Sequence, residues 1–232
     1  MSAYVFQPAP PPSVAVAGIT TRFPVHRIYC VGRNYADHVR EMGADPRSEP
    51  PIFFMKPADA VVASGSEVAY PSQTADFHYE AELVVAIGRG GRAANREAAE
   101  SFVYGYAVGI DFTRRDLQAA ARKKGLPWDV SKGFDQSAGI GSIHPAVVGG
   151  HRRTGRLWLT QNGTRRQDAD LADMIWSVPD VITELSTFFE LAPGDLIYTG
   201  TPAGVGALKP GDEVVAGIDG LGESRFRIGP AR

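Results

Sequence analysis

Two carboxylates, Glu80 and Glu82, stand two residues apart at the start of the apolar run 83–87. The run has the length and composition of a buried strand, and residues two apart on a strand point to the same side. Like charges held that close raise each other's pKa and cost stability unless a cation lies between them. A hard divalent cation meets this need, so the pair predicts a metal site. The alternative is a solvated pair that protects an exposed strand edge.

A third carboxylate, Asp111, ends the apolar segment 102–110, which we predict to be a strand. The residues that follow, Thr113 to Asp116, form a variant of the capping box and predict a helix that ends near Gly125. Asp111 is therefore expected at a junction between a strand and a helix. Carboxylates in that position serve both as metal ligands and as helix caps, and both readings remain open.

A candidate general base, His38, lies three residues before Glu41 in segment 35–42. This segment is predicted to be a short helix with Asn34 as its N-cap and a glycine after its end. On a helix the two side chains share one face, so Glu41 can orient the imidazole and raise its basicity. The alternative is a surface ion pair on an ordinary amphipathic helix. The proline-containing loop that follows makes the helix short, and such an element could act as a lid.

Lys132 lies among apolar and small residues in segment 128–135, where a buried ammonium requires a carboxylate or a bound anion. The glycine-rich segment 200–206 is not a phosphate-binding fingerprint, but its backbone amides and the Thr201 hydroxyl could bind a carboxylate. The single cysteine, Cys30, stands in a strand-like apolar run and is interpreted as a core residue rather than a nucleophile.

Composition sets the limits of what the chain can be. With 232 residues, of which 44% are hydrophobic and 22% charged, it can bury one sizeable core. We expect an extended proline-rich arm over residues 1–25, followed by one catalytic domain over 26–232. The net charge of −2 gives no basic footprint for nucleic acid. No apolar run approaches the ~18 residues of a membrane span and no export signal is evident, so we expect a cytoplasmic protein.

The remaining pattern is that of a β-rich protein with a few helices. Segments 28–31, 52–55, 156–161, 196–199 and 213–218 are strand-like, and Asn162-Gly163 is a strong hairpin signal. Segment 177–189 opens with a capping residue and a proline and carries apolar residues at helical spacing. This stripe predicts a helix packed on the core.

Several motifs together resemble the fumarylacetoacetate hydrolase family over residues 26–228. In order along the chain they are CVGRNYADH (30–38), FMKP (54–57), HYEAEL (78–83), GIDFTRRD (109–116), KGFD (132–135) and YTGTPAGVG (198–206). The resemblance implies an α+β, β-rich fold, a mixed β-sandwich roll with a few peripheral helices, and a homodimer. It also implies that Glu80, Glu82 and Asp111 bind one Mg²⁺ or Mn²⁺ per chain.

Within the family, the short form with His38 and Glu41 is similar to the acylpyruvase, oxaloacetate decarboxylase and bacterial fumarylpyruvate hydrolase branch. The implied substrate is an acylpyruvate, with fumarylpyruvate cleaved to fumarate and pyruvate in a gentisate-type pathway of aromatic degradation. His38, oriented by Glu41, would deprotonate the attacking water, and Lys132 would neutralise charge beside the metal. The residues expected to contact the substrate are Arg33, Arg115, Gln118 and Thr201.

Three other functions remain open. An acylpyruvase or oxaloacetate decarboxylase would use the same chelate, and decarboxylation needs no water nucleophile. A keto-acid tautomerase or hydratase would form product without breaking a carbon–carbon bond. A non-catalytic ligand-binding protein is the alternative from a different class, and the presence of all three carboxylates and the His38–Glu41 pair argues against it.

Overall fold

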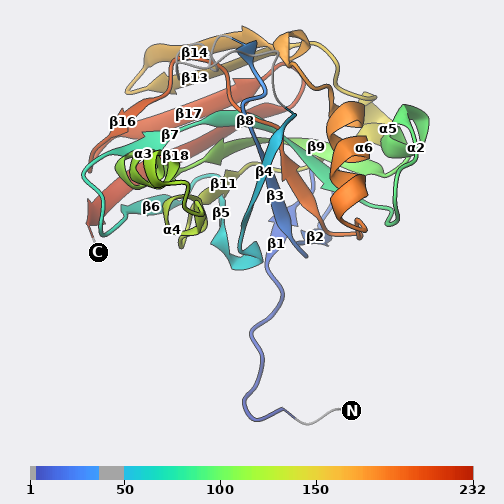
Figure 1. The fold of residues 1–232 in the computed structure, drawn as a ribbon, viewed down its shortest axis with the longest axis horizontal. Coiled ribbons are helices and arrows are strands. Elements are labelled where there is room, and N and C mark those ends of the chain that lie inside the picture. The colour runs from blue at the N-terminus through green and yellow to red at the C-terminus, as the bar shows by residue number, and fades with distance from the viewer. Residues whose placement is uncertain (1–3, 37–49, 232) are drawn as a thin grey trace.

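The computed structural model describes residues 4–36 and 50–231. Two large β-sheets pack face to face, and helices cover the ends of the stack (Figure 1). His38 and Glu41, which we predict on a helix over 35–42, lie outside the described residues.

The main sheet carries the carboxylates. Its strand order is β4-β3-β15-β8-β9-β11-β5, and β12 also pairs with β9. The strands are β3 (Ile28–Gly32), β4 (Ile52–Lys56), β5 (Val61–Ala63), β8 (Ala81–Ile87), β9 (Val103–Asp111), β11 (Ala138–Ile140), β12 (His144–Pro145) and β15 (Leu196–Tyr198). All seven residues of β8 are buried, which explains why the sequence shows a continuous apolar run rather than an alternation. The predicted strands at 83–87 and 102–110 are confirmed.

The second sheet has the order β14-β13-β17-β18-β6. Its strands are β6 (Glu67–Tyr70), β13 (Arg156–Gln161), β14 (Thr164–Asp170), β17 (Glu213–Ile218) and β18 (Gly222–Ala231). Asn162 and Gly163 join β13 to β14 with φ of 50° and 78°, the left-handed pair that a tight hairpin turn requires. The predicted hairpin is confirmed.

The core between the two sheets takes every second residue of the main sheet. Leu83 and Val85 of β8 and Val108 of β9 pack with Leu157 of β13 and Val214 of β17 in one cluster. The intervening residues point to the opposite face. There Val84, Ala86 and Ala107 pack in a second cluster with the N-terminal hairpin. This alternation decides the face on which the carboxylates lie.

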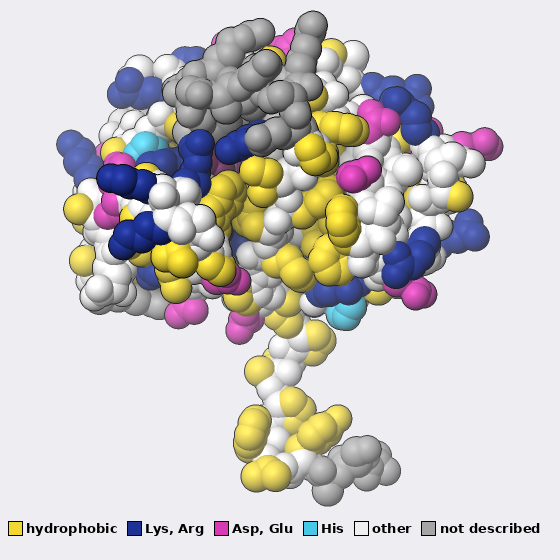
Figure 2. Space-filling view, viewed as in Figure 1, with side chains coloured by type: hydrophobic (Ala, Val, Ile, Leu, Met, Phe, Trp, Pro, Cys, Tyr) yellow, Lys and Arg dark blue, Asp and Glu magenta, His cyan; other side chains and the backbone are white. Residues whose placement is uncertain are grey.

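Two small sheets complete the strands. β10 (Thr113–Arg114), β7 (Phe77–Tyr79) and β16 (Gly206–Leu208) form one, and β1 (Ser13–Ala15) and β2 (Arg22–Pro24) form the other. Val14, Val16 and Phe23 of the hairpin are buried on the main sheet, so the second half of the segment 1–25 packs on the body. Residues 4–12 extend away from it and expose apolar side chains (Figure 2).

Helix α6 (Val178–Phe188) begins with a capping box between Ser177 and Asp180 and buries its apolar stripe, as the sequence predicts. It packs on α2 (Arg96–Glu100), and α5 (Ala146–Gly149) lies on the same side (Figure 1). The short 3₁₀ turns are η1 (Ala58–Ala60) and η2 (Leu171–Asp173). Within the described residues, no helix is long and apolar enough to cross a membrane.

Helices α3 (Arg115–Lys124) and α4 (Asp129–Lys132) stand beside the edge of the main sheet where β4 lies. The capping box predicted at Thr113 is wrong. Helix α3 has no side-chain cap at its start, because the Asp116 carboxylate accepts hydrogen bonds from the Thr74 hydroxyl and the Ala75 amide. Thr113 lies in β10 and its hydroxyl points toward the carboxylates. The end of α3 is as predicted, since Gly125 adopts φ of 64° there.

Candidate metal centre

Glu80, Glu82 and Asp111 converge because β8 and β9 are antiparallel neighbours. The register pairs Glu82 with Gly109 and Ala81 with Ile110, and the Asp111 amide donates to the Glu80 carbonyl at 2.8 Å. Glu80 and Asp111 therefore lie opposite each other and share a face, and Glu82 shares it by alternation. The three side chains continue the row of Val84, Ala86 and Ala107 on the face turned away from the second sheet.

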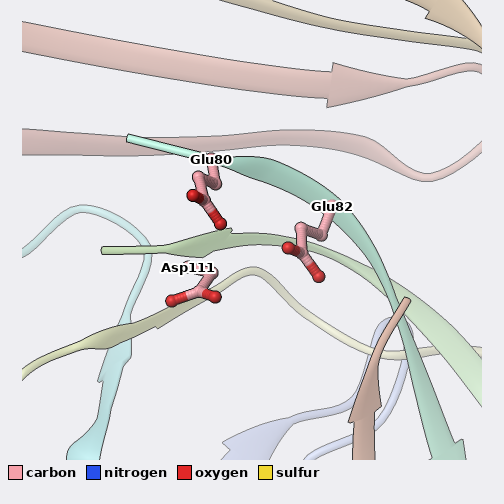
Figure 3. Close-up of side chains that lie close together, drawn as sticks. All are labelled: Glu80, Glu82 and Asp111. Atoms are coloured by element: carbon pink, nitrogen blue, oxygen red, sulfur yellow. The ribbon is translucent and has the colours of Figure 1, made fainter. Parts of the chain in front are cut away.

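The three carboxylates are close enough to share one ion (Figure 3). Each offers one oxygen, and these oxygens lie within 4.8 Å of one another. All three residues are buried, with relative exposures of 5%, 1% and 0% for Glu80, Glu82 and Asp111. Such a cluster cannot remain fully ionised in a buried place without cations.

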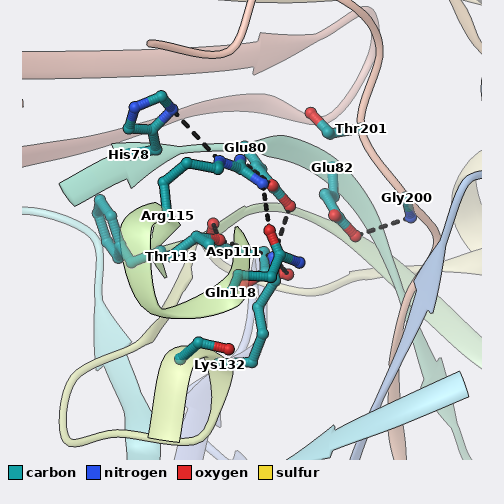
Figure 4. Close-up of polar contacts among 12 residues, drawn as sticks. His78, Glu80, Glu82, Asp111, Thr113, Arg115, Gln118, Lys132, Gly200 and Thr201 are labelled. Atoms are coloured by element: carbon teal, nitrogen blue, oxygen red, sulfur yellow. Dashed lines mark hydrogen bonds and ion pairs between the residues drawn. The ribbon is translucent and has the colours of Figure 1, made fainter. Parts of the chain in front are cut away.

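Three basic side chains supply positive charge, and Figure 4 shows two of them, Lys132 and Arg115. The Lys132 ammonium lies 2.8 Å from Glu80 Oε2 and 2.7 Å from Asp111 Oδ2 and donates to the Thr113 hydroxyl at 2.6 Å. The Arg115 guanidinium donates to Glu80 and, at 2.5 Å, to Gln118 Oε1. Burial alone would lower the pKa of Lys132, but Asp111 and Glu80 outweigh it and raise that pKa above its ordinary value.

Lys56 is the third cation, and it is completely buried. Its Nζ lies 2.8 Å from Asp111 Oδ1, and it donates to the Phe112 carbonyl at 3.2 Å and to the Lys132 carbonyl. The contact with Asp111 is an ion pair without hydrogen-bond geometry, so Asp111 Oδ1 accepts no hydrogen bond within the described residues. A buried carboxylate oxygen in that condition suits a metal ligand.

Glu82 differs from the other two carboxylates because no ammonium or guanidinium of the described residues pairs with it. It accepts one hydrogen bond, from the Gly200 amide at 2.8 Å. Burial, followed by the charges of Asp111 and Glu80, holds the pKa of Glu82 well above its ordinary range. Three hard oxygen donors, one of which is costly to ionise without a cation, fit Mg²⁺ or Mn²⁺.

A pocket opens beside the carboxylates. Its lining includes polar side chains around the carboxylates, apolar side chains and two further arginines. They are Glu80, Arg115, Gln118, Lys132 and Thr201, then Val31, Phe54 and Trp128, then Arg33 and Arg122. Arg33 adopts a left-handed backbone with φ of 64°, which is uncommon outside glycine and clusters at functional sites. The pocket therefore combines the charged side chains around the carboxylates with apolar side chains and two further arginines.

The structure brings together most residues that the sequence suggests for the site. Besides the three carboxylates, these are Lys132, Arg33, Arg115, Gln118 and Thr201. Gln118 uses its carbonyl oxygen for Arg115, which leaves its N–H donors for other partners. His38 and Glu41 lie outside the described residues, so their role stays a prediction.

Thr201 has a narrower role than its hydroxyl alone suggests. The hydroxyl donates its hydrogen to the Ala81 carbonyl at 2.8 Å and accepts from the amide nitrogen of the buried Gln167 at 2.8 Å. Gln167 also accepts from the Ala81 amide at 3.0 Å. A hydroxyl has one hydrogen, so Thr201 cannot also donate it to a substrate in this arrangement. It anchors the glycine-rich loop to the strand of the carboxylates.

Sequence reasoning missed Lys56 and Thr113 as parts of the site. Lys56 ends a strand whose other residues are apolar, and a lysine there resembles an ordinary exposed strand end. The signal that could have revealed it is the proline that follows, since Lys56-Pro57 halts the strand beside α4. The interpretation of Cys30 is consistent with its complete burial, which raises the pKa of its thiol well above the ordinary value.

The chain matches one protein family and several known relatives over most of its length. Residues 27–229 match the family model described as "Fumarylacetoacetate (FAA) hydrolase C-terminal". The mitochondrial oxaloacetate tautomerase of Rattus norvegicus is 45% identical over 201 residues, which cover 87% of this chain and 90% of that protein. The fumarylpyruvate hydrolase of a Ralstonia species is 43% identical over 187 residues, covering 81% and 97%.

A solved structure agrees over nearly the whole chain. The crystal structure of fumarylpyruvate hydrolase from Pseudomonas aeruginosa, in complex with Mn²⁺ and pyruvate, superposes with a TM-score of 0.96 at 53% identity. The match covers 98% of this chain and 100% of that one. The β-rich roll with peripheral helices that the sequence predicts is thereby confirmed.

Proposed function

The chain belongs to the fumarylacetoacetate hydrolase family, and from that premise we propose that it hydrolyses a carbon–carbon bond of an acylpyruvate, with fumarylpyruvate as substrate. The products are fumarate and pyruvate. The observation that carries the proposal is the convergence of three buried carboxylates beside a pocket that Glu80, Lys132 and Arg115 line.

Glu80, Glu82 and Asp111 would hold one Mg²⁺ or Mn²⁺. Mn²⁺ and pyruvate are bound together in the Pseudomonas aeruginosa enzyme, which supports both the ion and the product. When bound, the cation supplies Lewis-acid stabilisation of the negative charge that develops on the 2-oxo oxygen. The carboxylates fit such an ion because they are hard donors on one face of two paired strands.

The residues around the carboxylates orient the substrate. Gln118 and Arg115 stand on one face of α3 and offer N–H donors to the oxygens of the pyruvate part. Lys132 holds a positive charge at a fixed place, because its ammonium is bound to Glu80, Asp111 and Thr113. Preorganised charges of this kind stabilise a developing anion without reorganisation.

The hydrolytic step needs a general base, and His38 is our candidate from the sequence. Oriented by Glu41, it would take a proton from the water whose oxygen bonds to C4 of fumarylpyruvate. The C3–C4 bond then breaks, C4 becomes the carboxyl carbon of fumarate, and C3 takes up a proton to give pyruvate. Oxygen and both hydrogens of the water are thereby accounted for.

A second candidate reaction acts on oxaloacetate, by tautomerisation or decarboxylation. It is favoured by relatives named oxaloacetate tautomerase at 43–45% identity in mammals. Decarboxylation adds no water to a carbonyl and needs no base that activates water, so His38 separates it from hydrolysis. Tautomerisation moves a proton from C3 to the 2-oxo oxygen, which a base can assist, and is distinguished instead because it breaks no carbon–carbon bond.

The test measures loss of the diketo-enol absorbance of fumarylpyruvate and acetylpyruvate, and pyruvate formation from oxaloacetate, with Mn²⁺ present. We expect His38→Ala to lower kcat/KM for fumarylpyruvate by about 10²–10⁴-fold. Decarboxylation of oxaloacetate by the same variant should change by less than about threefold, because this reaction requires only that the substrate chelates the metal ion. A wild-type protein that cleaves neither acylpyruvate while binding Mn²⁺ would refute the hydrolase assignment.

We further propose that the protein acts in the cytoplasm, in a gentisate-type degradation pathway, and as a homodimer. The substrate supports the pathway, since fumarylpyruvate is a ring-opened dicarboxylate. The extended residues 4–12, with exposed Tyr4, Val5 and Phe6, support a contact with a second copy. Light scattering of the full chain and of a chain lacking residues 1–12 tests the dimer.

A further inference from the structure

The face of α3 that lines the pocket carries one more cation than the chemistry at the carboxylates uses. Arg115, Gln118 and Arg122 are spaced by three and four residues, so they share one side of the helix, and all three line the pocket. Arg115 donates hydrogen bonds both to Gln118 and to Glu80. Arg122 lies seven residues further along the axis, which is about 10 Å.

Arg122 has no partner of opposite charge within the described residues. No hydrogen bond or ion pair joins it to the rest of 4–36 and 50–231, although the residue is half-buried. Burial, followed by the like charges of Arg33 and Arg115, lowers the pKa of Arg122 below its ordinary value. A half-buried guanidinium without a carboxylate partner, near other guanidiniums, is unfavourable unless an anion binds it.

The favourable interaction of basic residues with a helix C-terminus does not explain why Arg122 lies in the pocket. Basic residues are favourable near a helix C-terminus, but Lys123 and Lys124 already meet that preference from exposed positions. Only Arg122 of these three lines the pocket. Figure 2 shows how Lys and Arg side chains gather over α3 beside the apolar surface at the centre of this face.

Part of the pocket lining is apolar. Val31, Phe54 and Trp128 form this part, and the rings of Phe54 and Trp128 lie with centroids 5.6 Å apart. Such a surface suits an uncharged carbon chain. The pocket therefore offers a ligand three kinds of surface: the carboxylate cluster with its cations, apolar side chains, and a further arginine about two helical turns from Arg115.

We infer that Arg122, with Arg33 beside it, binds the distal carboxylate of the substrate and so selects 2-oxo acids that are dicarboxylates. The inference rests on the proposed function, and it deepens it by assigning a residue to the acyl half. In a seven-carbon chain, six bonds of about 1.5 Å in a zigzag separate the two carboxyl carbons by about 7–8 Å. That length, together with the reach of an arginine side chain, matches the offset of Arg122 from Arg115.

A binding experiment tests the inference without any turnover. The probes are 2-oxoheptanedioate and 2-oxoheptanoate, which differ only in the distal carboxylate and lack the 4-oxo group needed for cleavage. Calorimetry on the Mn²⁺-loaded protein should show a preference for the dioate. In Arg122→Met we expect affinity for the dioate to fall about 10–100-fold, and affinity for the monoacid to change by less than about threefold.

Two further variants make the result interpretable. Arg122→Lys keeps the charge but not the planar fork, so an intermediate loss for the dioate alone is expected, about 3–10-fold. Lys123→Met removes an exposed cation from the same helical turn and should leave both affinities unchanged. Equal losses for both probes in Arg122→Met, or no loss for the dioate, would overturn the inference.

Kinetics then separate this inference from the proposed function. With fumarylpyruvate, Arg122→Met should raise KM about 10-fold or more, whereas kcat/KM for acetylpyruvate, which has no distal carboxylate, should stay within about threefold. A wild-type protein that prefers the dioate but cleaves no acylpyruvate would refute the reaction and leave the Arg122 assignment standing. Cleavage of fumarylpyruvate that Arg122→Met does not impair would refute the assignment and leave the reaction standing.

Discussion

Glu82 and Asp111 should behave in opposite ways when each is neutralised in the metal-free protein. Asp111 is paired with both Lys56 and Lys132, at 2.8 and 2.7 Å, and all three side chains are buried. Asp111→Asn removes the charge that both ammoniums share, and breaking a buried pair costs about 3–5 kcal/mol. For a chain of this size we expect the melting temperature to fall by about 6–20 °C.

Glu82→Gln should not destabilise the metal-free protein and should raise its melting temperature at neutral pH. The side chain has no ammonium partner among the described residues, and a glutamine oxygen can still accept from the Gly200 amide. A carboxyl whose pKa is raised in the folded state contributes most stability below its unfolded pKa, here 4.5, and loses it as pH rises through the folded pKa. The advantage of Glu82→Gln over wild type should therefore be larger at pH 8 than at pH 5.

Both variants should lose the stabilisation that a bound cation provides. In wild type, a free Mn²⁺ concentration of 100 times Kd adds about 2.7 kcal/mol, or roughly 5–11 °C. Scanning calorimetry of chelator-treated protein, with and without Mn²⁺, measures all of these quantities. Glu213→Gln, at an exposed strand position, is the matched control. The reasoning fails if Asp111→Asn is as stable as Glu82→Gln without metal, or if Glu82→Gln keeps the wild-type shift with Mn²⁺.

Two other substitutions test the surroundings of the carboxylates. In Lys56→Met, Asp111 keeps one ammonium, and the Phe112 and Lys132 carbonyls lose their donor. Urea unfolding should then show a loss of about 3–5 kcal/mol in the free energy of unfolding. The exposed Lys209→Met should change that free energy by less than about 0.5 kcal/mol. A loss no larger than that of the control would contradict the structural role of Lys56.

Cys30→Ala should keep kcat within about twofold because the thiol is buried in the core, and its unfolding free energy should fall by about 1 kcal/mol. An inactive, folded Cys30→Ala protein would show that the core interpretation is wrong.

The strands of the site were predictable because their signal is local. The apolar run after Glu82 and the one before Asp111 describe strands that are buried on both faces, and they became β8 and β9. The alternation rule also placed Glu80 and Glu82 on one face. What the local pattern cannot give is the register that sets Asp111 opposite Glu80, since it depends on the pairing of two strands. The family resemblance supplied that step in the sequence interpretation.

The two wrong predictions, a capping box at Thr113 and an N-cap at Asn34, also arise because the partners of these residues lie far along the chain. Thr113 and Asp116 have the right spacing for a capping box, but each finds a partner far along the chain, Lys132 for Thr113 and Thr74 for Asp116. Asn34, predicted as an N-cap, uses its side chain to bridge Trp176 and Thr199. Short polar side chains satisfy whichever backbone or charged group tertiary folding brings near, and propensity cannot anticipate that choice.

The balance of charge in the pocket links the metal, the substrate and Arg122. Within the described residues, Glu80, Glu82 and Asp111 face Lys56, Lys132 and Arg115, so the carboxylate cluster is already neutral without an ion. A divalent cation would leave an excess of two positive charges, and Arg122, which has no carboxylate partner within 4–36 and 50–231, adds a third. A dicarboxylate would remove two of these three charges, with one carboxylate near the cluster and the other at Arg122, whereas a monocarboxylate would leave Arg122 unpaired. The proposed preference for a dianionic substrate rests on this distribution of cations in the pocket.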